Sequence, residues 1–195
     1  MNVLALEDKL RTFNANQDWY LGKPSIERPL EIIDRDSPEL QVRCNFFEIK
    51  KLINKIQAST FLCFQKKISF WFATGGAGFC LSKSLTEKMR DHAADGKFSS
   101  VADKMRLPDD VTMGYVVELL AGVPMTRIEE FHSHLEPLRL VNNLAKQISF
   151  SYSSYGNERN VIEIDGFSES EDPTRFQSIH CNLFPYFSWC PPSVR

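Results

Sequence analysis

Three glycines in a short run could let a ligand approach the backbone closely. Gly75, Gly76 and Gly78, with Ala77 among them, follow a segment rich in aromatic residues and precede an amphipathic one. Small residues between a strand and a helix leave room for a bound molecule at the main chain. The run matches neither the P-loop nor the dinucleotide-binding pattern, which excludes those two modes of phosphate binding. A tight turn that needs a positive φ remains the alternative.

Two adjacent carboxylates, Asp109 and Asp110, follow Pro108 where a helix is expected to begin. Aspartate is a favoured N-cap residue, and the helix dipole stabilises negative charge there, so we expect one of the two to cap the helix. The other could point into a cleft and act as a general base toward a substrate hydroxyl. Helix capping alone is the alternative for both.

His132 and His134 are two residues apart, and in an extended segment their side chains would lie on the same face. This spacing suits metal ligands, although no third ligand stands nearby in the sequence. Two partly buried histidines that only form hydrogen bonds are the alternative. The sequence contains neither the G-x-S-x-G nor the H-E-x-x-H pattern, so it gives no support to a serine hydrolase or a zincin.

The elements that must position these residues mix strands and helices, which predicts the α/β fold class. The aromatic run at residues 68–73 predicts a strand central in a sheet, ending at the glycines. Ser84 and Glu87 suggest a capping box for the helix that follows. A first helix is expected from residue 3 with no visible N-cap, and further strands are expected at residues 19–21, 148–152 and 161–164.

The overall composition excludes several classes of protein. The chain has 195 residues, of which 43% are hydrophobic and 25% charged, as in ordinary soluble globular domains. Its formal net charge of -2 gives no basic excess to neutralise a phosphate backbone, which argues against a nucleic-acid binder. No apolar stretch approaches the length that spans a bilayer, and the first residues do not resemble a signal peptide.

The five cysteines include no C-x-x-C pair, which argues against a zinc ribbon or a thioredoxin-like site. Cys181 and Cys190 bracket a short segment rich in proline and aromatic residues, and this spacing suits a local disulfide. Such a bond would imply an oxidising compartment. Two buried thiols are the alternative.

Taken together, these segments resemble the Fringe glycosyltransferases, which are β1,3-N-acetylglucosaminyltransferases that extend O-linked fucose on EGF-like repeats of Notch receptors. The segments that carry the resemblance are residues 70–80, 106–110, 131–136, 178–181 and 189–191. The glycine run and the Pro-Asp-Asp sequence recur in related β1,3-glycosyltransferases, whereas Phe-His-Ser-His and the Trp-Cys-Pro tail point to Fringe itself. The resemblance covers about residues 2–40 and 66–191.

The resemblance implies a GT-A-type fold, a mixed sheet flanked by helices, with UDP-GlcNAc as donor and Mn²⁺ as cofactor. Asp110 resembles the catalytic base of a single inverting displacement, which leaves Asp109 as the N-cap candidate. His134 resembles a ligand of the metal, which offsets the charge that develops on the departing UDP. The three glycines would line the substrate site, and Cys181 and Cys190 match a family disulfide.

The sequence also departs from the family pattern. The family's Asp-rich metal motif, the donor-binding half of the sheet, the stem and the membrane anchor lie upstream of the helix that begins here at Met1. We therefore expect residues 1–195 to form one Fringe-like domain that is incomplete at its N-terminus, with Golgi localisation and membrane attachment supplied by the missing part. Cys80 resembles a cysteine whose partner also lies upstream. Residues 42–65 have no counterpart and are interpreted as an insertion, either retained intron or a lineage-specific loop.

Two functions follow as hypotheses. The first is a transferase that adds N-acetylglucosamine to O-linked fucose, with Asp110 as its base. The second is a catalytically inactive C-terminal fragment that at most binds the acceptor. A core galactosyltransferase of mucin glycans is a third possibility, against which the Trp-Cys-Pro tail at residues 189–191 argues.

Overall fold

A computed structural model of the chain describes residues 1–34 and 66–192. The chain divides into two compact units, the first formed by Met1–Glu27 with Trp71–Arg195 and the second by Arg28–Phe70. All the candidate site residues belong to the first unit. The expected insertion at residues 42–65 lies outside the described residues.

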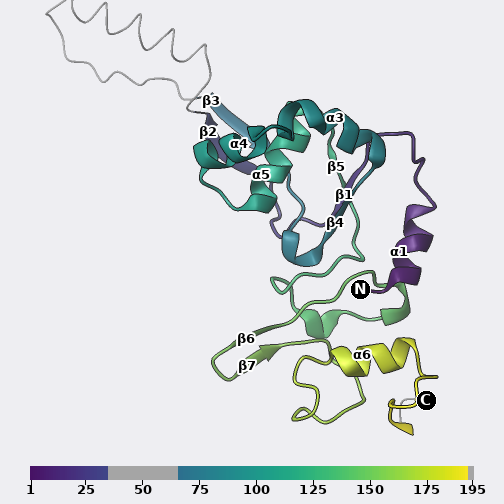
Figure 1. Cartoon of the computed structure of the whole chain (residues 1–195). Helices are drawn as coiled ribbons and strands as arrows, with labels where there is room; N and C mark the ends of the chain where they lie inside the picture. Colours follow the sequence, from purple (N-terminus) through teal and green to yellow (C-terminus); the bar gives the residue numbers. More distant parts are fainter. Residues whose placement is uncertain (35–65, 193–195) are drawn as a thin grey trace, which may run out of the picture. The chain divides into compact units, whose positions relative to one another are not determined.

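A three-stranded mixed sheet stands at the centre of the first unit (Figure 1). Its middle strand β1 (Tyr20–Gly22) pairs antiparallel with β4 (Phe79–Leu81) and parallel with β5 (Met125–Arg127). Glycine is required at residue 22, where β1 passes close to Ala73, because a β-carbon there would lie 2.3 Å from the β-carbon of Ala73. The mixed strand directions agree with the α/β class predicted from the sequence.

Two hydrophobic clusters cover the two faces of β1, because successive side chains of a strand point to opposite faces. Tyr20 is fully buried in one cluster, which it shares with Leu85 and Met89 of α3 (Lys83–Ala93). Val116 and Val117 of the π-helical turn η2 (Val116–Leu120) complete that cluster. Neighbouring helices α4 (Lys97–Met105) and α5 (Asp109–Tyr115) contact each other, and α4 also contacts α3.

The second cluster contains Leu21 together with residues from the segments that carry the candidate site, including Ala77, Phe131 and Ile148. Helix α1 (Val3–Leu10) packs on this cluster through Leu6. The sheet is therefore covered by helices on both faces, which is the layered arrangement that the resemblance implied.

The first helix has an N-cap, contrary to the sequence prediction. Asn2 is buried, and its side-chain oxygen accepts a hydrogen bond from Ala5 N at 3.3 Å. Its side-chain nitrogen donates to Ala145 O at 3.0 Å, and its backbone N–H donates to Ile148 O at 2.7 Å. Asparagine is among the preferred N-cap residues, so the residue type is compatible with a cap. The hydrogen bonds to Ala145 and Ile148, far along the chain, hold Asn2 in that position.

The expected capping box of α3 is also wrong. The N-cap is Ser82, whose hydroxyl oxygen accepts from Leu85 N at 3.2 Å. Ser84 instead donates to Asp18 Oδ1 at 2.6 Å, and this hydrogen bond is the largest cause holding the pKa of the Asp18 carboxyl below its usual value. The Ser84 hydroxyl, which the local pattern assigned to the helix cap, thus forms a tertiary hydrogen bond to Asp18 instead.

The strand predicted as central at residues 68–73 is shorter and has a different partner. Strand β3 (Lys66–Phe70) pairs antiparallel with β2 (Leu30–Asp34) in a two-stranded sheet of the second unit. The extended pairing stops because the next backbone N–H groups bond to side chains. Trp71 N donates to Glu118 Oε2 at 2.6 Å, and Ala73 N donates to Tyr20 Oη at 2.8 Å.

The strands predicted at residues 148–152 and 161–164 are absent from the described structure. Ile148 and Ile162 are fully buried, whereas Tyr152, which the alternation at residues 148–152 placed on the same face as Ile148, is 48% exposed. The backbones at the two isoleucines run irregularly around the short turns η3 (Leu138–Leu140) and η4 (Leu144–Lys146). A hairpin of β6 (Ser153–Tyr155) and β7 (Glu158–Asn160) lies between the two predicted strands instead.

Near the C-terminus, helix α6 (Phe176–Leu183) carries Cys181, which forms a disulfide with Cys190 and confirms that predicted pair. Cys80 is a half-buried free thiol, and burial raises its pKa. Among the described residues, no helix has the length and apolar character needed to cross a membrane.

Candidate functional site

The three glycines lie in a turn that is fastened to a distant loop. We call residues 74–78 the glycine turn; its centre is the 3-10 helix η1 (Gly75–Ala77). Thr74 N donates to Lys23 O at 3.0 Å, and the hydroxyls of Thr74 and Ser25 share a short hydrogen bond. Gly78 has a φ of 83°, so at this position the turn does need a positive φ. At Gly75 and Gly76, by contrast, an added side chain would contact neighbouring residues.

The carboxylate of Asp110 lies against Gly75. Its Oδ2 accepts a hydrogen bond from Gly75 N at 3.0 Å, and its Oδ1 accepts one from Val111 N at 2.9 Å. A β-carbon on Gly75 would sit 3.5 Å from the β-carbon of Asp110, in van der Waals contact. Since an ionised carboxylate offers about four acceptor positions, each oxygen keeps one free for a further donor.

Neither aspartate occupies the N-cap of α5, so the expected cap at Asp109 is wrong. Pro108 stands there with φ -52° and ψ 156°, and both carboxylates fall in the first turn. Asp109 Oδ1 accepts from the backbone N–H of Asp110 at 3.0 Å. The helix dipole still stabilises both charges at these positions, which accounts for two acidic residues without either one capping.

His134 lies close to the same turn, in an exposed loop. A β-carbon on Gly76 would come within 3.4 Å of its Nδ1 atom. Gly75 and Gly76 are adjacent, and one contacts Asp110 while the other contacts His134. The structure thus brings together, at one turn of backbone, three motifs that lie up to about sixty residues apart in the sequence.

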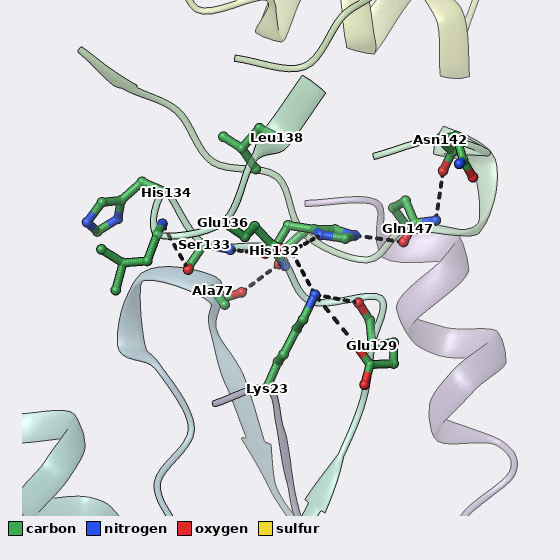
Figure 2. Close-up of polar contacts among 12 residues, drawn as sticks. Lys23, Ala77, Glu129, His132, Ser133, His134, Glu136, Leu138, Asn142 and Gln147 are labelled. Carbon is green, nitrogen blue, oxygen red and sulfur yellow. Dashed lines mark hydrogen bonds and ion pairs between the residues drawn. The ribbon is translucent and has the colours of Figure 1, made fainter. Parts of the chain in front are cut away.

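His132 does not join this group, so the two histidines do not form the H-x-H pair considered from their spacing. Its ring is buried, with Nε2 2.8 Å from Gln147 Oε1 (Figure 2). Its Nδ1 lies 3.2 Å from Glu136 Oε2. The chain turns at His134, and Figure 2 shows the two rings pointing away from each other. The interpretation as a hydrogen-bonding histidine applies to His132 alone.

A partly buried ion pair lies beneath the loop that carries His132 and His134. Lys23 Nζ lies 2.8 Å from Glu136 Oε2 and 3.7 Å from Glu129 Oε2 (Figure 2). Burial opposes ionisation of Glu136, but the hydrogen bonds from Lys23 and from Ser133 N outweigh it and hold the pKa of this carboxyl below its usual value. Sequence reasoning missed the pair, because Lys23 and Glu136 are 113 positions apart.

A small pocket of about 80 Å³ opens beside this ion pair. Lys23, Ser25, Ala77, Ser133 and Glu136 are among the residues that line it. Small-molecule sites usually measure several hundred Å³, so this pocket could admit one polar group of a ligand rather than a whole nucleotide.

Ser149 joins the glycine turn to the histidine segment. Its hydroxyl donates to Ala77 O at 2.6 Å and accepts from His132 N at 3.0 Å. A serine hydroxyl can donate once and accept twice, so one side chain holds both segments together. No local pattern marks such a residue; only the predicted burial of its neighbour Ile148 hinted at it.

The described residues supply one candidate metal ligand at this site. His134 presents an exposed imidazole, and the neutral imidazole is the commonest metal-binding side chain in proteins. Within residues 1–34 and 66–192, no group of three or more His, Cys, Asp or Glu side chains is arranged to hold an ion. His134 is the residue that the resemblance names as a metal ligand, and the described residues form no complete ion site around it.

Comparison with known proteins identifies the family to which the chain belongs. The sequence matches the family described as Fringe-like over residues 1–187. The chain belongs to the Fringe-like family. This confirms the resemblance drawn from the glycine run, the Pro-Asp-Asp sequence and the Phe-His-Ser-His sequence, and the α/β fold that it implied.

Curated relatives match along nearly the whole chain. The "Fringe glycosyltransferase" of Drosophila melanogaster is 48% identical over 98% of this chain and 42% of its own length. The "Beta-1,3-N-acetylglucosaminyltransferase lunatic fringe" of Bos taurus is 44% identical over 100% of this chain and 46% of its own length. The protein of the same name in Homo sapiens is 42% identical over 98% of this chain and 45% of its own length. The chain spans less than half the length of these Fringe relatives.

Proposed function

We propose that this chain contributes the acceptor-activating part of a β1,3-N-acetylglucosaminyltransferase. The reaction would move N-acetylglucosamine from UDP-GlcNAc to O-linked fucose on EGF-like repeats of Notch-like proteins. Membership of the Fringe-like family and the names of its relatives support the reaction class. The observation that carries the site assignment is the contact of Asp110 with Gly75 and of His134 with Gly76.

Asp110 would act as the general base. A hydroxyl of the acceptor fucose would donate a hydrogen bond to a carboxylate oxygen and lose its proton to it as the oxygen attacks the anomeric carbon. The new glycosidic bond forms as the bond from that carbon to the UDP oxygen breaks on the opposite face, which inverts the configuration. The N–H groups of Gly75 and Val111 would hold the carboxylate in one orientation during this step.

His134 would provide one ligand to Mn²⁺. When bound, the ion supplies a positive charge that offsets the negative charge of the leaving diphosphate. Family resemblance assigns further ligands to an Asp-rich motif upstream of the segment that matches α1. The glycine turn would let the donor approach its main chain, because Gly75 and Gly76 present no side chain between Asp110 and His134.

The Cys181–Cys190 disulfide supports an oxidising compartment. We place the protein in the Golgi lumen, as the resemblance implies, with attachment to the membrane through the upstream anchor that the family carries. The chain would meet glycoprotein acceptors in that compartment.

A non-catalytic acceptor-binding fragment is the second candidate. The observation that favours it is that, among the described residues, no group of three or more His, Cys, Asp or Glu side chains could hold a metal ion. Turnover separates the two candidates, because the second at most binds a fucosylated EGF repeat and only the first predicts transfer.

The test compares the 195-residue chain with a version extended upstream to include an Asp-rich motif. Each is assayed with UDP-GlcNAc and with UDP-galactose on an O-fucosyl EGF repeat. We expect the extended protein to transfer N-acetylglucosamine, and Asp110→Asn to abolish transfer while UDP binding is retained. Asp109→Asn is the matched control and should stay within a few-fold of the parent. Normal turnover by Asp110→Asn would remove this residue from its role, and binding without turnover in every version would favour the second candidate.

A further inference from the structure

One side chain from the β6–β7 hairpin holds the loop that carries His134. Asn160 is the last residue of β7 and pairs with Ser153 across the hairpin. Its Nδ2 donates to His134 O at 2.9 Å and to Glu136 O at 2.8 Å. Its Oδ1 accepts from Leu138 N at 2.9 Å. Three hydrogen bonds from one amide thus fix the backbone at His134, Glu136 and Leu138.

The chemistry of these bonds requires an asparagine. An amide side chain carries two N–H donors and one oxygen acceptor, and here both donors meet carbonyls while the oxygen meets an N–H. Rotating the amide by half a turn would set its oxygen against two carbonyl oxygens. An aspartate of the same shape could accept from Leu138 N but could not donate to either carbonyl.

The loop is fixed on its other side by different contacts. Ser133 N donates to Glu136 Oε1 at 2.9 Å, and that carboxylate is bound to Lys23. Leu138 is fully buried and anchors the chain after the turn. Between these fixed points, His134 itself is exposed, so its side chain has few packing contacts to keep it in place. Its position against Gly76 therefore depends on the backbone that carries it.

We propose that Asn160 is a positioning residue for His134. It fixes the loop so that the imidazole rests against Gly76, ready to bind the metal. The role of His134 as a metal ligand rests on the proposed function, whereas its placement against Gly76 rests on the structure. Groups that orient a ligand commonly matter almost as much as the ligand itself, because metal binding then needs less ordering of the site.

The test uses the 195-residue chain with isotope-labelled histidine and glycine, observed by NMR. Asn160→Asp is compared with the wild type and with Asn157→Asp, which makes the same chemical change in the exposed turn of the same hairpin. Without metal, we expect a nuclear Overhauser contact between the His134 ring and Gly76 in the wild type and in Asn157→Asp, and its loss in Asn160→Asp. In a Mn²⁺ titration of the upstream-extended protein, which carries the Asp-rich motif, paramagnetic broadening of the His134 ring should need roughly 10–100-fold more metal in Asn160→Asp than in the wild type.

The outcomes separate the two claims. If the ring contact is lost in Asn160→Asp while Mn²⁺ leaves His134 of the upstream-extended wild type unbroadened, Asn160 positions the ring and the metal role in the proposed function is wrong. If Asn160→Asp keeps both the ring contact and the wild-type titration midpoint, the positioning role is overturned. Should that variant fail to fold, hydrogen exchange at Leu138 N in the wild type decides. Strong protection supports the clamp, and exchange as fast as in an open loop overturns it.

Discussion

Replacing Gly114 by alanine tests how closely α5 must approach the segment that leads into the glycine turn. A β-carbon at this position would lie 2.3 Å from the β-carbon of Phe72 and 2.7 Å from the carbonyl oxygen of Trp71. Carbon atoms pack best at about 3.5–4.0 Å, so the helix and this segment would have to separate by roughly 1 Å. Asp110 sits at the start of the same helix, and its contact with Gly75 would be disturbed by that movement.

Two effects of this substitution oppose each other. Alanine is favoured over glycine within a helix by about 1 kcal/mol. Overpacking of a well-packed core costs typically 1–3 kcal/mol, and the upper end applies because the obstructing atoms belong to backbone and to a β-carbon. We therefore expect net destabilisation of about 2 kcal/mol, which corresponds to a fall in Tm of roughly 4–8 °C for a domain of this size.

Thermal and urea unfolding of the purified chain measure this change. Gly75→Ala is the matched control, since its β-carbon would make only van der Waals contact with Asp110 at 3.5 Å, and its stability should stay within about 0.5 kcal/mol of the wild type. If Gly114→Ala proves as stable as the wild type or more so, α5 does not pack against residues 71–72 as described.

Two further predictions concern a buried hydroxyl and the disulfide. Burial raises the pKa of Tyr20 to about 12, above its ordinary value of 10.0. The protonated form is thus favoured in the folded state, so this contribution to stability is complete below pH 10 and is lost as the pH rises toward 12. Ultraviolet titration should show a tyrosine ionising near pH 12 that disappears in Tyr20→Phe; ionisation of all tyrosines near pH 10 in the folded protein would contradict the burial. The Cys181–Cys190 bond closes a loop with a sequence separation of 9, for which chain entropy gives about 2–3 kcal/mol of stability. Reductant should lower the urea midpoint of the wild type and leave that of the Cys181→Ser/Cys190→Ser variant unchanged, and equal sensitivity of the two would argue against the bond.

The parts of the site that the sequence predicted are those marked by residue types within one short run. The glycines at 75–78, the pair at Asp109 and Asp110, and His134 were each visible locally. Family resemblance supplied the roles that spacing alone left open. The disulfide was predicted for the same reason, because both cysteines stand in one short segment.

The parts that sequence reasoning missed depend on partners far along the chain. The strand at residues 68–73 ends early because Trp71 N and Ala73 N bond to the side chains of Glu118 and Tyr20. Ser149 lies in a segment where only alternation of apolar residues was visible, and alternation does not specify hydrogen-bond partners. Asn160 stands just before a predicted strand, and no local pattern indicates its three hydrogen bonds. The residues that hold the site in place are therefore determined by tertiary contacts, whereas the candidate reactive residues can be recognised in short stretches of sequence.

The central claim is that Asp110 and His134 act together across the glycine turn. A crystal structure of the upstream-extended protein with UDP and Mn²⁺ tests it most directly. We predict that an imidazole nitrogen of His134 ligates the ion and that a carboxylate oxygen of Asp110 faces the open side of the nucleotide site. An ion held entirely by other residues, with Asp110 closed off from the site by its backbone hydrogen bonds, would contradict the account.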